Sequence, residues 1–192
     1  MSTLSEQRIF CFRAKGSIIQ SQRDSVGDKV RFPYIIWTGA KVSISAIDEW
    51  RINDFLISTN NEKLDIQAVH HYLTRSTWAK GIDLGTVTAS TANSLNFGLY
   101  HHESQIGFAR LITDYATFAY LCDVYVLEEY QGEGLGRWLM ECIHSHPIFE
   151  KLRKILLFTT TAPWLYEKFG YEPVNQKNYA WAITRPDIYS DR

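Results

Sequence analysis

The stretch Val124-Tyr-Val-Leu-Glu-Glu-Tyr-Gln-Gly-Glu-Gly-Leu-Gly-Arg-Trp-Leu-Met140 joins an apolar strand to a helix through a turn that contains three glycines. The first N–H groups of a helix have no intrahelical partner, and the aligned peptide dipoles there favour negative charge. Gly132, Gly134 and Gly136 lack a Cβ and adopt positive φ at little cost, so successive amides can converge on an anion. The stretch therefore predicts a strand, a turn and a helix that together cradle a diphosphate.

The glycine spacing separates three common phosphate-binding motifs. The dinucleotide fingerprint needs a third glycine where Arg137 stands, and a Walker loop needs a Gly-Lys-Ser or Gly-Lys-Thr that is missing here. What remains is Gln131-x-x-Gly134-x-Gly136 directly after a strand. This pattern resembles the phosphate-binding motif of the GNAT superfamily of N-acetyltransferases, whose first position is Arg or Gln. In that family the loop holds the diphosphate of acetyl-coenzyme A.

Two further segments carry the same resemblance. The segment 154–173 is similar to the family's next strand and helix, with an Ala-x-x-Leu-Tyr-x-Lys-x-Gly-Tyr ending, and 96–127 is similar to the preceding strands. The resemblance covers about residues 50–190. It implies an α/β (α+β) GNAT acyltransferase fold, a mixed central sheet flanked by helices, with a GNAT domain at 50–192.

The first 49 residues are the least similar to that pattern, and we expect them to form a β-rich extension. Short β-favouring runs at 8–13, 30–38 and 41–47 are separated by turn-like residues. The extension is expected to pack on the domain or on a partner subunit, so a homodimer is among the expected partners.

Within the domain, hydrophobic periodicity and turn residues predict alternating elements. Strands are expected at 51–57, 95–100, 105–113, 118–127, 154–159, 172–173 and 179–184, and helices at 63–74, 85–95, 134–146 and 162–169.

Composition excludes several classes of function. A net charge of −1 gives no general attraction to nucleic acid, and no apolar run reaches membrane-spanning length. We therefore expect a cytoplasmic protein that binds neither nucleic acid nor membrane. Cys11, Cys122 and Cys142 lack metal-ligand spacing and are expected to be reduced, with Cys122 facing the core. The histidine pair at 144 and 146 lacks a third ligand, so no metal is expected.

The resemblance implies roles for individual residues in holding acetyl-CoA. The strand ending at Val126 would pair its main chain with the pantetheine arm, and an N–H near Val126 or Leu127 would face the thioester oxygen. Many relatives have Asn near the start of the last helix, where this chain has threonines, so Thr160 is a candidate replacement. The full set of predicted coenzyme-binding residues is Val124, Val126, Leu127, Gln131, Gly132, Gly134, Leu135, Gly136, Arg137 and Thr160.

Two residues are candidates for the catalytic steps. Tyr166 matches a tyrosine that many relatives place beside the coenzyme sulfur, and a phenol with a pKa of about 10 can protonate a thiolate as general acid. Asp123 is a carboxylate inside an apolar strand, on the same face as Tyr125, and it either serves the amine as base or anchor or is satisfied by backbone amides or Arg110. His71, His101 and His102 are rival bases.

The acceptor site is expected between the first helices and the loop before the glycine-bearing strand. Its candidate residues are Tyr72, Trp78, Asp114, Tyr115 and Phe118, whose aromatic rings form either a pocket or part of the core.

These observations favour an N-acetyltransferase that uses acetyl-CoA and a primary amine, with a small amine or amino-acid-like acceptor preferred over a protein. Direct attack in a ternary complex is expected, because no cysteine stands where an acetyl carrier would be needed. The alternatives are a protein N-acetyltransferase, a non-catalytic acyl-CoA-binding sensor or assembly module, and a nucleotide-binding protein of another class.

Overall fold

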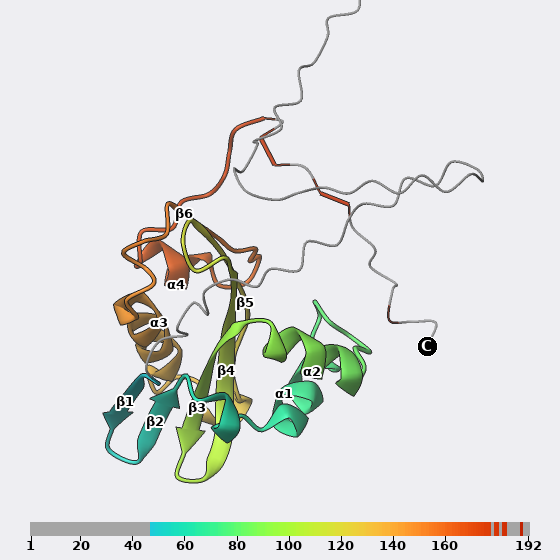
Figure 1. Ribbon diagram of the computed structural model, residues 1–192, viewed down its shortest axis with the longest axis vertical. Helices are drawn as coiled ribbons and strands as arrows, with labels where there is room; N and C mark the ends of the chain where they lie inside the picture. Colours follow the sequence, from blue (N-terminus) through green and yellow to red (C-terminus); the bar gives the residue numbers. More distant parts are fainter. Residues whose placement is uncertain (1–46, 178, 181, 184–188, 190–192) are drawn as a thin grey trace, which may run out of the picture. The chain divides into compact units, whose positions relative to one another are not determined.

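The computed structural model describes residues 47–177, 179, 180, 182, 183 and 189. Within them the sheet has six strands in the order β1-β2-β3-β4-β5-β6 (Figure 1). All neighbouring pairs are antiparallel except β5 and β6, which are parallel. The sheet is therefore mixed, as expected. The three β-favouring runs of the predicted extension lie outside the described residues, apart from Ile47.

The central strands form because they are apolar along most of their length. β3 (Leu95–His101) is buried at every position but the last, and β4 (Ser104–Thr113) is buried from Gln105 to Ala109. β5 (Phe118–Val126) follows through a short turn and completes the meander. Strands that are buried on both faces need cover on both sides. Apolar runs joined by short turns therefore form the central strands β3, β4 and β5.

Helices cover the two faces of the sheet separately (Figure 1). α1 (Ile66–Leu73) and α2 (Leu84–Ala92) pack on one face, where Val69, Leu73 and Val87 meet Phe108 and Tyr125. α3 (Leu135–Ser145) packs on the other face, where Leu139 and its neighbours meet Phe97 and Leu121. β5 contributes side chains to both clusters, so it lies between two cores.

The first strand expected at 51–57 is two strands. β1 (Glu49–Ile52) and β2 (Phe55–Ser58) are joined by a tight turn in which Asn53 has φ 50°. Asparagine tolerates the left-handed region better than most residues. A short 3₁₀ helix, η1 (Asn61–Lys63), then precedes α1, so the helix expected from Lys63 begins three residues later.

The C-terminal part is less regular than expected. β6 (Lys154–Leu156) stops three residues early, and α4 (Pro163–Glu167) spans five residues. Glu172 and Pro173 are not strand, and neither are the described residues of 179–184. Among the described residues, each helix is too short or too polar to span a lipid bilayer.

Candidate active site

β5 and β6 diverge, and this leaves half of one edge of β5 open. The two strands pair only from Phe118 with Lys154 to Tyr120 with Leu156, whereas β5 continues to Val126. The chain after β6 leaves the sheet and leads into α4 (Figure 1). The backbone of residues 121–126 therefore faces a gap between strands, where an extended ligand can form strand-like hydrogen bonds.

The register of β4 and β5 identifies which N–H group points into this gap. Val126 is paired with Gly107, and the Leu127 N–H donates to the Ile106 carbonyl at 2.8 Å. In an antiparallel ladder this makes Val126 a non-hydrogen-bonded position, so its N–H and C=O point away from β4. Of the two predicted thioester donors, Val126 is thus available, whereas the Leu127 N–H is occupied.

The glycine turn follows at the end of β5. After the 3₁₀ turn η2 (Glu128–Tyr130), Gly132 and Gly134 have φ of 88° and 84°. A Cβ at either position would meet nothing within 4 Å. The positive φ therefore favours glycine here although there is room for a side chain, and the open space leaves the amides accessible to a ligand.

The Gln131 side chain ties this turn to the strand. Its Nε2 donates to the Val126 carbonyl at 2.9 Å. Gln131 was predicted to bind the coenzyme. In the structure its amide satisfies the outward carbonyl of β5, so it fixes the turn relative to the strand edge.

The start of α3 has no cap from a side chain. Gly134 occupies the N-cap position, and the first backbone bond runs from the Trp138 N–H to the Gly134 carbonyl at 3.0 Å. The N–H groups of residues 135–137 therefore precede the hydrogen-bonded ladder, at the positive end of the helix dipole. An anion of one or two phosphates fits these donors.

The other predicted coenzyme-binding residues have different environments. Val126 and Leu135 are buried in the cluster beneath α3, and Val124 packs against it, so each of the three offers only backbone groups. Gly136 approaches Val126, since a Cβ there would lie 3.9 Å from its Cγ2. Arg137 is exposed and bonds Glu141 at 2.9 Å. Thr160 is exposed in the loop before α4.

Tyr166 lies on α4 and lines a cavity of about 520 Å³. Its ring packs edge-on against Tyr171 at 5.9 Å and adjoins the same apolar cluster as Val126. Burial raises the pKa of the Tyr166 phenol. The hydroxyl therefore stays protonated through neutral pH, as a proton donor must.

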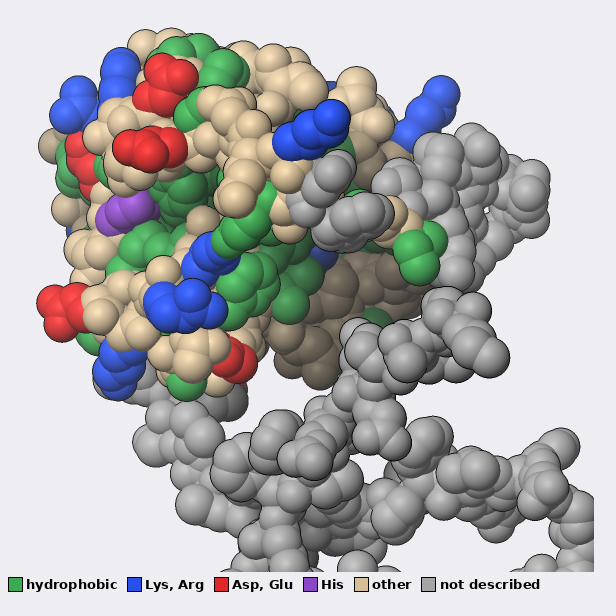
Figure 2. All heavy atoms as spheres, turned by 90° about the horizontal axis from the view of Figure 1, so that it is seen from above, with side chains coloured by type: hydrophobic (Ala, Val, Ile, Leu, Met, Phe, Trp, Pro, Cys, Tyr) green, Lys and Arg blue, Asp and Glu red, His purple; other side chains and the backbone are tan. Residues whose placement is uncertain are grey.

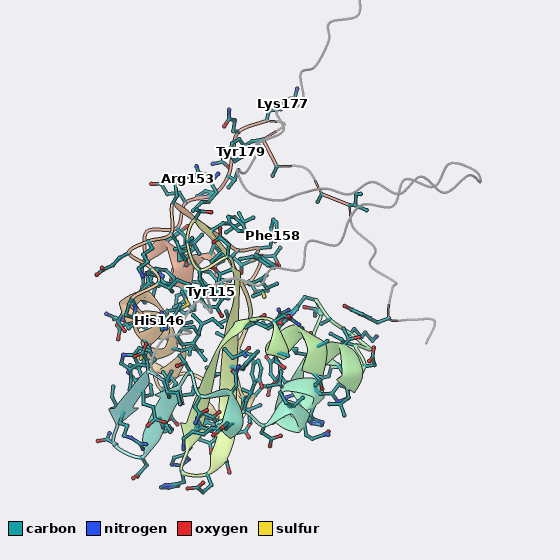
Figure 3. All side chains as sticks on the ribbon, in the orientation of Figure 1. Tyr115, His146, Arg153, Phe158, Lys177 and Tyr179 are labelled. Atoms are coloured by element: carbon teal, nitrogen blue, oxygen red, sulfur yellow. The ribbon has the colours of Figure 1, made fainter. Side chains whose placement is uncertain are left out.

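That cavity lies between β6 and the chain that follows α4. Its lining comes entirely from residues between Ile155 and Ala180, and much of it is apolar. Phe158, labelled in Figure 3, is exposed and packs edge-on against Tyr120 of β5 at 5.7 Å. Figure 2 shows hydrophobic side chains in the hollow of the face seen from above. The cavity therefore lies beside β6 and α4, and its lining includes neither β5 nor the glycine turn.

Asp123 is paired with Arg110, one of the two environments that its place in an apolar strand predicts. Its Oδ2 accepts from Arg110 Nε at 2.5 Å, and its Oδ1 accepts from Trp78 Nε1 at 3.1 Å. Arg110 also donates to Ser94 Oγ at 3.1 Å. The Asp123 side chain is only 8% exposed, so this pairing removes the cost of an isolated buried charge.

The backbone at Asp123 is irregular. It has φ 54°, and two residues of β5 stand opposite one of β4 between the pairs Phe108–Tyr125 and Arg110–Cys122. This is a β-bulge, which bends the strand and increases its twist. The bulge lies beyond the last β5–β6 pair, Tyr120 with Leu156, and three residues before Val126.

The bulge also changes the position of Cys122. Paired partners share a face, so Cys122 lies on the face of Arg110 and belongs to neither apolar cluster. The expectation that it faces the core is wrong. Burial and neighbouring Asp123 raise the pKa of its thiol to about 12. Cys142 is buried in the core as expected, and Cys11 lies outside the described residues.

The predicted acceptor residues fall into two groups. Tyr72 stacks on Tyr125 with ring centroids 3.7 Å apart, and Trp78 lies 6.2 Å from Tyr72 while reaching Asp123. This aromatic group flanks the strand near its bulge. It also includes Arg75, which sequence reasoning missed: its guanidinium lies over Tyr72 and bonds Glu128 at 3.0 and 3.2 Å.

The second group belongs to the β4–β5 turn. Asp114 accepts from three backbone N–H groups and from Thr117 Oγ1, and these bonds hold the pKa of its carboxyl well below its usual range. Tyr115, labelled in Figure 3, has φ 58° and packs on the core, and Phe118 begins β5. Phe118 and Val126 are eight residues apart on β5, or roughly 26 Å. These three residues therefore lie at the far end of β5 from Val126, and their predicted role in the acceptor site stays a prediction.

None of the three rival bases lies at this strand edge. His71 is exposed on α1, and His101 and His102 lie at the β3–β4 turn.

Comparisons with known proteins agree with this arrangement. Residues 93–173 match the family model of the acetyltransferase (GNAT) domain. A protein of Xanthomonas campestris pv. campestris, described as a GNAT-family acetyltransferase, has a crystal structure that is 39% identical in sequence. It aligns over 71% of this chain and 96% of its own, with a TM-score of 0.69.

More distant structures share the fold alone. One is a Staphylococcus aureus protein with 23% identity and a TM-score of 0.58, which aligns over 68% of this chain and 99% of its own.

In sequence, a protein of Gibberella zeae described as an acetyltransferase is 30% identical over 148 residues, which is 66% of this chain and 84% of that protein. With the open strand edge and the uncapped glycine turn, these matches show that the chain belongs to the GNAT superfamily of N-acetyltransferases.

Proposed function

We propose that the protein transfers the acetyl group of acetyl-CoA to a primary amine by direct attack. One observation carries the proposal: the open edge of β5 ends at an outward Val126 N–H and continues directly into an uncapped helix start. Acetyl-CoA has the matching order, an acetyl thioester, an amide-bearing arm and a diphosphate. The family uses this coenzyme, and a GNAT-fold protein of Clostridium acetobutylicum was crystallised with it.

In the proposed reaction, the amine nitrogen attacks the thioester carbon while the Val126 N–H stabilises the negative charge that develops on the oxygen. The C–S bond then breaks, and the thiolate takes the proton of the Tyr166 hydroxyl. The amine gives its proton to Asp123, which keeps free lone pairs because Arg110 and Trp78 use only two. Asp123 then releases this proton to solvent, and the Tyr166 phenolate regains a proton from solvent.

Direct attack is favoured over an acetyl-cysteine intermediate by the state of Cys122. Its pKa of about 12 keeps the thiol protonated at neutral pH. A protonated thiol is a weak nucleophile.

A small or amino-acid-like acceptor is favoured by the walls beside the bulge. Tyr72, Tyr125 and Trp78 offer aromatic faces, and the charged groups among them are already paired as Arg110–Asp123 and Arg75–Glu128. Paired charges leave little attraction for a highly charged peptide.

A protein acceptor is the second candidate. The Escherichia coli ribosomal-protein-S18-alanine N-acetyltransferase shares the fold at 24% identity and a TM-score of 0.50. Trp78 is 53% exposed at the acceptor side, so a peptide can reach it.

Calorimetric titration with acetyl-CoA, with CoA and ADP as competitors, tests the donor site. We expect binding that requires the pantetheine arm as well as the diphosphate. Thiol release is then followed with a panel of small amines and N-terminal peptides. Absence of coenzyme binding would remove the proposal, and binding without thiol release from any amine would favour the acyl-CoA sensor.

A further inference from the structure

Three potential metal ligands meet at the end of the sheet, in two neighbouring hairpin turns. Asp54 lies in the β1–β2 turn, and His101 and His102 lie at the β3–β4 turn; both turns are at the lower end of the sheet (Figure 1). One ligand atom from each of the three lies within 4.8 Å of the others. We propose that Asp54, His101 and His102 bind a divalent transition-metal cation such as Zn²⁺.

The backbone holds the two turns together independently of any ion. The His102 N–H donates to the Asp54 carbonyl at 3.1 Å, and Phe55 pairs with His101 in the β2–β3 ladder. His102 has φ 54°, which departs from the strand and brings its ring beside that of His101 at 4.4 Å. The fold therefore assembles the three ligands from positions about 50 residues apart before a metal arrives.

His101 is oriented in the way that metal-ligating histidines usually are. Its ring stacks on Phe55 at 4.7 Å, and its Nδ1 lies 3.2 Å from the Tyr130 hydroxyl. A hydrogen bond at one ring nitrogen fixes the orientation of the ring and leaves the other nitrogen for the ion. Tyr130 thus acts as an outer partner of the site, one residue before Gln131.

The ligand chemistry favours zinc over a hard cation. Two imidazoles and one carboxylate suit Zn²⁺, Cu²⁺ or Ni²⁺, whereas Mg²⁺ and Ca²⁺ prefer oxygen ligands. Bonds of about 2.0–2.2 Å in a tetrahedron place ligand atoms roughly 3.3 Å apart, and small side-chain rotations bring atoms that lie within 4.8 Å of one another to that spacing. Asp54 and His102 are exposed and free to rotate into that geometry, and solvent fills the fourth position.

Other histidines offer a matched control. His71 is exposed like His102 but lies on α1, away from the cluster. Asparagine tolerates positive φ, so His102→Asn preserves the turn while removing the ligand. Asp54→Asn keeps the shape of the side chain and removes its charge.

The experiment is a calorimetric titration of the full chain with Zn²⁺ alone, repeated with Co²⁺ to record its visible spectrum. We expect one ion per chain, with affinity at least tenfold weaker in Asp54→Asn and in His102→Asn and unchanged in His71→Asn. Tyr130→Phe should weaken binding by roughly tenfold through the outer partner.

Several results would overturn the site. They are an absence of saturable Zn²⁺ binding, equal loss of affinity in His71→Asn, and a Co²⁺ spectrum dominated by sulfur charge transfer, which would assign the ion to cysteines. Circular dichroism and the thermal midpoint without metal verify that each variant is folded, so a loss of binding is separable from a loss of structure.

Discussion

The starts of α1 and α3 show two different uses of a helix N-terminus. α1 begins after Asp65, whose Oδ1 accepts from the Ala68 N–H at 3.0 Å. α3 begins after Gly134, which has no side chain to offer. The Asp65 carboxylate satisfies one of the free N–H groups and complements the dipole, so α1 is capped by its own chain. α3 has no side-chain cap, so both tasks are open to a ligand.

The missing side-chain cap lowers the stability of α3 relative to a capped helix such as α1. Loss of an N-cap costs typically about 1 kcal/mol of stability. α3 compensates through its buried side, where Leu135, Leu139, Met140 and Ile143 pack into the core. A helix that is anchored by packing can leave its first turn open for binding, whereas α1, with only Val69 and Leu73 fully buried, relies more on its cap.

Giving α3 a cap of its own should have the largest effect. In Gly134→Asp, the carboxylate would accept the free N–H groups and repel a diphosphate, and the positive φ would be strained. We expect acetyl-CoA affinity to fall roughly 100-fold in calorimetry. Gly134→Asn, which tolerates φ 84° without a charge, should lose clearly less. Equal losses in the two variants would mean that conformation, rather than charge, controls binding.

Removing the Tyr166 hydroxyl should separate chemistry from this binding site. Tyr166→Phe keeps the ring that packs on Tyr171 but removes the proton donor, so kcat should fall by roughly 100-fold. Coenzyme affinity should match that of the unaltered protein. Since burial raises the phenol pKa, the hydroxyl stays protonated until the pH exceeds its ordinary value near 10. Ionisation of Tyr166 should therefore lower the activity only above that pH. A loss of activity that begins at a lower alkaline pH would point to another group.

The sequence predicts the open helix better than it predicts the contacts of Asp123. Gly134 and the apolar stripe of α3 lie next to one another in the chain, so local pattern suffices, and the observed 135–145 is within one residue of the expected 134–146. The Trp78–Asp123 bond joins residues 45 apart, and nothing local signals it. The bulge at Asp123 depends equally on the register of two strands. Asp114 is different, because an Asp three residues before Thr117 is a local turn signal, and the turn lies between β4 and β5 as the chain pattern predicts.

The cap of α1 provides the converse test. Asp65→Ala leaves the Ala68 N–H without its partner, and the free energy of unfolding in urea should fall by about 1 kcal/mol. Acetyl-CoA affinity should stay unchanged, because α1 lies on the opposite face of the sheet from α3 (Figure 1). A large loss of affinity would show that the start of α1 also contributes to coenzyme binding. The two helix starts would then not have separate roles.

The smallest effect is expected from Arg137, the only cation of the first turn of α3. It is 66% exposed and already paired with Glu141, so its attraction to a diphosphate is partly cancelled and is screened by salt. Arg137→Gln should weaken acetyl-CoA binding about threefold at low salt and not measurably at 0.5 M salt. Arg51→Gln is the matched control, since Arg51 is 64% exposed and also pairs with a nearby glutamate. If Arg137→Gln weakened binding tenfold at high salt, the Arg137 side chain rather than the helix start would be the main anchor of the phosphates. The two helices would then differ in binding because α3 carries this arginine, and not because its N-terminus lacks a cap.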